Sequence, residues 1–196
     1  MISIAITGGI ATGKTTVLNQ FKLCGLETHN SDLMVKDIYN NDTSTLLKIK
    51  KILPRVVNNK KINIKELSEI AFNNKKILKK LEGLIHPKLA SKREKIVRSG
   101  NINYKKTIVF EIPLLYEKNL NNEFDLIVAT RCCKQLQKRR ALKRRDMNEK
   151  KYLSIIKNQI KNNIKCKKSN YIIDTGIGKN HSLIQVKKLI KRLCAK

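Results

Sequence analysis

The chain has 196 residues, of which 41% are hydrophobic. This length suits one domain with a small insertion and is too short for two ordinary domains, and the apolar content excludes a disordered polycation. With 43 basic residues against 15 acidic ones, the net charge of +28 alone predicts a polyanionic partner such as nucleic acid.

The kind of basic residue weakens that prediction. Lysine supplies 34 of the 43 basic residues and arginine only nine. Lysine, asparagine and isoleucine are all abundant, and all three have A/T-rich codons, so a skewed genome explains much of the charge. We therefore expect no specific nucleic-acid partner, with a dedicated nucleic-acid surface as the alternative.

The cysteines and the apolar segments bear on location. The five cysteines are scattered, odd in number and free of any C-x-x-C pair, which argues against a disulfide framework and against a zinc site. There is no signal-peptide pattern and no apolar run of membrane length. We expect a cytoplasmic protein with reduced thiols and no membrane partner.

The first forty residues predict two strands, each followed by a helix. β-branched residues form the first strand and run directly into glycine, and apolar positions on one face mark the helix that follows. The expected elements are a strand over Met1–Thr7, a loop over 8–16, a helix over Thr15–Cys24, a strand over Leu26–Asn30, and a helix over Asp32–Tyr39 with Ser31 as its N-cap.

The next segment is basic and helical in pattern. From about Thr43 to Ser99 there are no strand signals, and breaks are expected near Pro54, at 58–59 and at 73–74. A further helix is expected to begin at His86-Pro87. This stretch predicts an inserted helical subdomain.

The remaining chain alternates strands with helices again. The expected elements are strands over Thr107–Ile112, Asp125–Thr130 and Tyr171–Ile173, a basic helix or mobile loop over Gln135–Arg145, and helices over Glu149–Ile164 and His181–Leu193. Such alternation predicts a three-layer α/β fold with a mostly parallel sheet of about five strands.

One motif carries chemistry. Residues 8–15 read G-G-I-A-T-G-K-T, the phosphate-loop (P-loop) pattern G-x-x-x-x-G-K-[ST], between a predicted strand and a predicted helix. Glycines let successive N–H groups point at phosphate oxygens, and the helix adds its positive end. Lys14 can bridge the outer phosphates, and the Thr15 hydroxyl can bind Mg²⁺. The motif predicts binding of ATP or GTP by Gly8, Gly9, Ala11, Thr12, Gly13, Lys14, Thr15 and Thr16.

Asp32 is the candidate acid-base residue. It follows the second predicted strand, and ligands of open α/β sheets bind at the carboxyl edge of the sheet. A carboxylate there can orient an acceptor hydroxyl and take its proton during phosphoryl transfer. It can equally serve to begin the next helix, and the residues alone leave both roles open.

Four arginines cluster in a chain that otherwise prefers lysine: Arg139, Arg140, Arg144 and Arg145. Arg140 and Arg144 are four residues apart, which predicts one helical face. Guanidinium groups suit phosphate oxygens, and a basic lid over 134–147 that closes over ATP would exclude water. A solvated basic face or an RNA-contacting helix is the alternative.

Together these residues resemble the dephospho-CoA kinase family nearly end to end. The opening ITGGIATGKTTV is similar to the first strand and P-loop of that family. HNSD, at 29–32, falls where the family has a D-x-D element, so Asp32 matches the second aspartate, the family's proposed base, and Asn30 replaces the first. LIHP at 84–87 and PLLYE at 113–117 match two further family elements.

The predicted lid also carries the resemblance. Gln137, Arg140 and Arg144 match the spaced Gln-Arg-Arg pattern of the family lid. The family usually places Asp directly after the last Arg, whereas here Arg145 intervenes before Asp146, so the resemblance leaves a role for that acid open.

Four more residues have open roles. Gln159 falls in the family order. His86 is either structural or a substrate contact, and Glu117 is either a surface or cap residue or a substrate contact. Glu111 could address Mg²⁺ through water.

The resemblance implies a single kinase unit with a P-loop core over 1–35 and 104–196. The helical subdomain over 36–103 would bind substrate. Lys14, Asp32 and Arg140 would be catalytic, Arg140 and Arg144 would also bind nucleotide, and Thr15 would hold the metal.

The implied substrates are ATP and dephospho-CoA, with Mg²⁺ as cofactor. Phosphorylation of the ribose 3′-hydroxyl would give coenzyme A, the final step of its synthesis. The alternatives are another small-molecule or nucleotide P-loop kinase, and a nucleic-acid-binding P-loop NTPase. No feature of the sequence indicates an oligomeric state.

Overall fold

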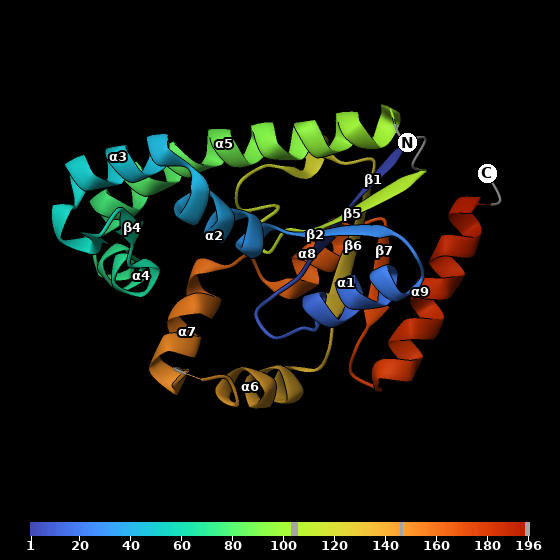
Figure 1. Ribbon diagram of the computed structural model, residues 1–196. Coiled ribbons are helices and arrows are strands. Elements are labelled where there is room, and N and C mark those ends of the chain that lie inside the picture. Colours follow the sequence, from blue (N-terminus) through green and yellow to red (C-terminus); the bar gives the residue numbers. More distant parts are fainter. Residues whose placement is uncertain (103–105, 146, 195–196) are drawn as a thin grey trace. The chain divides into compact units, whose positions relative to one another are not determined.

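The computed structural model describes residues 1–102, 106–145 and 147–194. The chain divides into two compact units (Figure 1). Met1–Asn30 and Asn103–Lys196 form the sheet unit, and Ser31–Ile102 form the helical unit. The insertion was expected to begin at 36; in the structure the helical unit begins at the first residue after the second strand.

The sheet unit is built on one parallel sheet. Within the described residues its five strands are β1 (Ile2–Thr7), β2 (Glu27–Asn30), β5 (Thr107–Glu111), β6 (Leu126–Arg131) and β7 (Tyr171–Asp174). Their order is β2-β5-β1-β6-β7, and every neighbouring pair is parallel. This confirms the predicted sheet. Because all strands run in one direction, their carboxyl ends meet at one edge.

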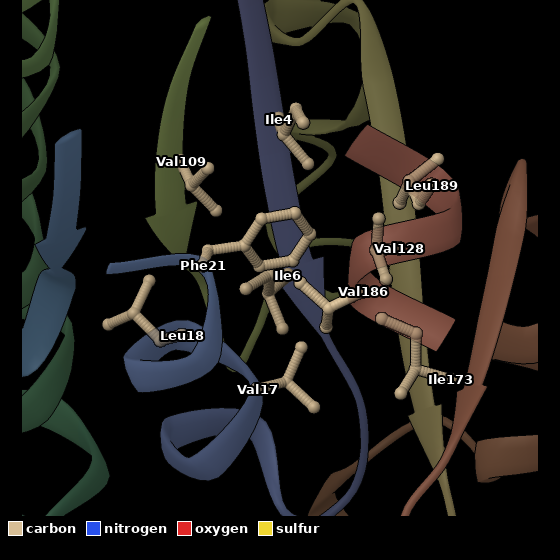
Figure 2. Close-up of a cluster of buried hydrophobic side chains, with 10 residues drawn as sticks. All are labelled: Ile4, Ile6, Val17, Leu18, Phe21, Val109, Val128, Ile173, Val186 and Leu189. Atoms are coloured by element: carbon tan, nitrogen blue, oxygen red, sulfur yellow. The ribbon is translucent and has the colours of Figure 1, made fainter. Parts of the chain in front are cut away.

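The helices in the described part of this unit are α1 (Lys14–Leu23), α6 (Lys134–Leu142), α7 (Glu149–Asn158), α8 (Asn162–Lys168) and α9 (Lys179–Cys194), with a 3₁₀ turn, η2, at Asn121–Glu123. α1 and α9 pack on strands of the sheet, whereas α6 and α7 pack against each other. Figure 2 shows Phe21 of α1 and Val186 of α9 packed against Ile4 and Ile6 of the central strand. α8 packs against β6, which completes the three-layer arrangement.

The prediction of one helix in this unit is wrong. The pattern over Glu149–Ile164 forms two helices, because α7 ends at Asn158 and α8 begins at Asn162. Gln159, between them, has an extended backbone, with φ −103° and ψ 145°. Its side chain bonds to a distant loop instead of facing a continuous helix, and that tertiary contact overrides the helical pattern.

The helical unit has its own small core. Its elements are α2 (Ser31–Asn41), α3 (Thr43–Ile52), the 3₁₀ turn η1 (Pro54–Val56), β3 (Val57–Asn58), β4 (Lys61–Ile62), α4 (Ile64–Asn73) and α5 (Lys75–Ile102). Ile49, Val56, Ile62 and Leu67 are buried together at its centre. No helix in the described part of the chain is long and apolar enough to cross a membrane.

The structure corrects two expectations for this unit. It contains a small antiparallel hairpin, with Val57 opposite Ile62, although no strand was expected. Asn59 and Lys60 both have positive φ, 48° and 58°, as a two-residue hairpin turn requires. Pro87 lies inside α5 and does not begin a new helix. The helix continues through it because α5 packs against α2, α3 and α4, which offsets the one missing backbone donor.

Candidate active site

The P-loop connects β1 to α1 at the carboxyl edge of the sheet. Gly8 and Gly13 have φ of 148° and 95°, which L side chains rarely adopt. A Cβ at Gly8 would lie 2.5 Å from Thr130 Oγ1, and one at Gly13 would lie 2.9 Å from the Thr175 side chain. The two motif glycines therefore allow both the backbone path and the close approach of two threonines.

Those threonines fix the middle of the loop through Thr12, which is fully buried. Thr12 Oγ1 donates to the Gly9 carbonyl at 2.9 Å and lies 2.7 Å from Thr130 Oγ1. Thr175 Oγ1 donates to the Thr12 carbonyl at 2.7 Å. The loop is thus held from β6 and from the end of β7. The sequence analysis missed Thr130 and Thr175, which are distant in the chain.

Three amide side chains hold the first half of the loop. The Gly9 N–H donates to Asn162 Oδ1 at 2.8 Å, and the Ile10 N–H donates to Gln159 Oε1 at 3.0 Å. Gln137 Nε2 donates to the Ile10 carbonyl at 2.8 Å. The resemblance includes Gln137 through the Gln-Arg-Arg pattern of the lid and Gln159 only through its order in the chain. Asn162 was not predicted, because a single Asn on a basic helix carries no signal of its own.

The second half of the loop runs into α1. Lys14 is buried, and its Nζ donates to the Gly8 carbonyl at 3.2 Å and to the Gly9 carbonyl at 2.9 Å. Its ammonium group therefore lies against the start of the loop, where it can attract phosphate oxygens. Ala11 is buried with φ 58°, and Thr16 lies in the first turn of α1. The loop thus presents a cation and a helix N-terminus together.

A carboxylate lies beside the predicted metal ligand. Thr15 Oγ1 donates to Glu111 Oε1 at 3.0 Å, and Asn30 Nδ2 donates to Glu111 Oε2 at 2.7 Å. Asn30 and Glu111 end the neighbouring strands β2 and β5 and pair in register. A carboxylate and a threonine hydroxyl at this corner are suitable ligands for Mg²⁺.

Asp32 is the second residue of the helical unit, which begins at Ser31. It is exposed and lies in the first turn of α2, where a carboxylate interacts favourably with the positive end of the helix. Ser31 is not the N-cap expected from the sequence, because it is the first helical residue. Its Oγ is buried and makes no hydrogen bond within the described residues.

The predicted lid residues differ in their contacts. Arg140 Nη1 donates to Thr175 Oγ1 at 3.1 Å, and Nη2 donates to the Thr175 carbonyl at 2.8 Å. Since Thr175 bonds to the P-loop, Arg140 is connected to that loop through one residue. Arg144 is exposed and lies beyond the end of α6, so the two arginines do not share a helical face as expected. The neighbouring Asp146 lies outside the described residues.

The remaining residues with open roles lie in different settings. His86 is exposed inside α5. Glu117 is not a surface residue: only 12% of its side chain is exposed, and its Oε1 lies 2.8 Å from Nζ of the fully buried Lys165. The five cysteines are free, and burial raises the pKa of the Cys132 and Cys166 thiols.

Comparison with known proteins identifies the family. A family model described as dephospho-CoA kinase matches residues 2–180. The chain is 34% identical over 190 residues to the dephospho-CoA kinase of Bartonella quintana, and the match covers 97% of both chains. It is 35% identical over 190 residues to that of Bartonella henselae, again covering 97% of both.

Solved structures agree with the sequence comparison. The dephospho-CoA kinase from Campylobacter jejuni matches with a TM-score of 0.71 and 27% identity, over 97% of this chain and 96% of that one. A shikimate kinase from Acinetobacter baumannii, at 17% identity and a TM-score of 0.53, shares the fold over 100% of this chain and 94% of its own. With a P-loop on a parallel sheet and relatives that match along nearly its whole length, the chain belongs to the dephospho-CoA kinase family of P-loop phosphotransferases.

Proposed function

We propose that this protein transfers the γ-phosphoryl group of ATP to the ribose 3′-hydroxyl of dephospho-CoA, giving ADP and coenzyme A. The observation that carries the proposal is the P-loop itself, held in a chain of this family by side-chain hydrogen bonds from Thr130, Gln137, Gln159, Asn162 and Thr175. A loop fixed in this way offers its remaining N–H groups to phosphate without reorganisation, which is how a phosphoryl-transfer site stabilises charge.

Lys14 and the N-terminus of α1 would bind the outer phosphates of ATP. The ammonium group is held against the Gly8 and Gly9 carbonyls, within the loop that would surround the phosphates. Arg140, anchored to Thr175, would close over the same phosphates, and Arg144, which is exposed beyond the end of α6, would join it in the lid over 134–147. Both arginines would reduce access of water to the transferred group.

Thr15 would hold Mg²⁺, with Glu111 beside it. A bound Mg²⁺ would neutralise charge on the β- and γ-phosphates. The Thr15 hydroxyl now donates to Glu111, so Glu111 orients that hydroxyl and keeps a negative charge close to it. Asn30, where the family pattern has aspartate, donates to the other carboxylate oxygen and fixes its direction.

Asp32 would accept the proton of the ribose hydroxyl as the new O–P bond forms. It is exposed in the first turn of α2, and so is accessible to an acceptor. The helical unit would bind dephospho-CoA, and its many lysines suit the pyrophosphate of that substrate. The free cysteines suit a reducing compartment, so we place the enzyme in the cytoplasm.

An acceptor assay tests the proposal. The purified chain is supplied with ATP, Mg²⁺ and one acceptor at a time: dephospho-CoA, a nucleoside monophosphate or shikimate. We expect ADP and coenzyme A with dephospho-CoA and no product above background with the others. Lys14→Ala is the control for contaminating kinases. Preferred phosphorylation of another acceptor by the wild-type chain would refute the assignment.

A further inference from the structure

A buried ion pair lies behind the side chains that hold the P-loop. Glu117 closes the PLLYE segment after β5, and Lys165 lies in α8. Lys165 Nζ is 2.8 Å from Glu117 Oε1 and donates to the Pro113 carbonyl at 3.0 Å. Lys165 is fully buried, and only 12% of the Glu117 side chain is exposed. Because burying two charges costs solvation energy, such a pair is poorly explained by stability alone.

The same carboxylate oxygen makes a second contact. Glu117 Oε1 accepts a hydrogen bond from the Ile160 N–H at 2.9 Å. Ile160 lies in the short connection between α7 and α8. Gln159 precedes it and Asn162 follows two residues later, and these two accept the N–H groups of Ile10 and Gly9 in the P-loop. A carboxylate outside the loop is thus connected to two loop amides through one short segment.

We propose that Glu117 is a positioning residue for nucleotide binding. It fixes the connection between α7 and α8 through the Ile160 N–H, and the connection in turn fixes the P-loop. Lys165 keeps Glu117 in place and balances its charge. The inference rests on the proposed function, because it takes the P-loop as the nucleotide site.

The contacts of Glu117 favour this role over direct substrate contact. Its Oε1 is engaged by both Lys165 and Ile160. Its Oε2 is buried and has no hydrogen-bond partner within the described residues. Burial lowers the pKa of Lys165, and the hydrogen bond to Glu117 opposes that change.

Two single substitutions separate the positioning contact from the charge. Glu117→Ala removes the acceptor for Ile160, whereas Glu117→Gln keeps an oxygen at that position. We expect Glu117→Ala to raise the Kd for Mg·ATP, measured by calorimetry on the full chain, about tenfold, with an equal rise in the KM for ATP and less than a twofold change in the KM for dephospho-CoA. Glu117→Gln should recover most of the affinity.

A double substitution separates positioning from stability. Glu117→Met with Lys165→Met removes both charges at similar volume, a change that often leaves stability intact or raises it. The positioning role predicts a wild-type melting temperature with ATP affinity still weakened about tenfold, because Ile160 has lost its acceptor. This variant decides the question if Glu117→Ala does not fold.

The exposed pair Lys138–Glu149, which joins α6 to α7, supplies the matched control. Glu149→Ala should leave the Kd for Mg·ATP within twofold of wild type. Wild-type ATP affinity in the folded double variant would overturn the proposal. So would a rise confined to the KM for dephospho-CoA. ATP binding is measured without an acceptor, so a wrong acceptor assignment would be recognised separately.

Discussion

In the sheet unit, side chains from β6, α6, α8 and the end of β7 converge on one loop, whereas in the helical unit the charged pairs join helices near the surface. Asp37 pairs with Lys92, and Asp42 pairs with Lys88, each connecting an early helix to α5. The loop contacts are largely buried, and the helix pairs are partly exposed. Polar groups in the first region fix the conformation of the P-loop, and those in the second add modest stability.

The largest effect is expected from removing the cation of the P-loop, Lys14. Lys14→Ala should lower turnover about 10³-fold, because it removes the charge that stabilises the transferred phosphoryl group. Circular dichroism and melting temperature should change little. Lys22→Ala, on the exposed side of the same helix, is the matched control in a steady-state assay. Unchanged turnover in Lys14→Ala would remove the P-loop from the mechanism.

Asp32 is an exception to the difference between the two units, because it belongs to the helical unit and yet is expected to control turnover. Asp32→Asn should lower kcat about 10²-fold or more while the KM for ATP changes little, as loss of a general base requires. Asp37→Asn, later in the same helix, should leave kcat near wild type. If Asp32→Asn alters only KM, the residue binds substrate or begins α2 and does not take the proton.

Arg140 tests the connection between lid and loop. Arg140→Ala removes both bonds to Thr175 and should raise the KM for ATP about tenfold. Arg139→Ala removes an exposed guanidinium from the neighbouring position and should have less than a twofold effect. Equal kinetics for the two variants would mean that Arg140 belongs, like Arg139, to a solvated basic face of α6.

The smallest effect is expected in the helical unit. Asp42 caps α3 by accepting the Thr45 N–H, and its side-chain bond to Lys88 holds the pKa of the Asp42 carboxyl below its ordinary value. Asp42→Ala should cost about 1 kcal/mol of unfolding free energy with unchanged ATP affinity.

The pH dependence of that contribution has a definite sign. Since the folded-state pKa of Asp42 is lowered, its stabilisation is present above the unfolded-state pKa and is lost as pH falls through the folded-state value. Urea unfolding of wild type and Asp42→Ala at pH 7 and at pH 3 should show the difference shrinking in acid. A difference that grows in acid would contradict the assigned ion pair.

The sequence predicts most of the sheet well, because β1, β5, β6 and β7 are short runs rich in β-branched residues and bounded by glycine, proline or charge, whereas β2 contains only one β-branched residue, Thr28. The P-loop is equally easy to predict from the sequence, because its eight residues are contiguous and their spacing follows from phosphate chemistry. By contrast, Thr130 and Thr175 contact Thr12 across 118 and 163 residues of chain, and no local pattern marks them. Their role depends on strand order, which a single sequence does not specify.

The structure also differs from the sequence-based prediction at a hairpin and at a proline of the helical unit. The hairpin at 57–62 is too short for a period-two pattern, and the positive φ values fall on Asn59 and Lys60 with no glycine to mark the turn. Pro87 is normally a signal of a helix start, and only the packing of α5 on three other helices overrides it. The contacts of Glu117 could not be predicted from the sequence either, because its partners Ile160 and Lys165 lie more than forty residues later in the chain.

The central place of β1 has a consequence for biosynthesis. Ile2 pairs with Thr107 and Ile4 with Leu126, so both neighbours of this strand are translated long after it. All of Ser31–Ile102 leaves the ribosome in the interval and can form its own core first. Until Thr107 and Leu126 are translated, the apolar segment Ile2–Thr7 has no strand to pair with, so the sheet core closes only after the helical unit has been synthesised.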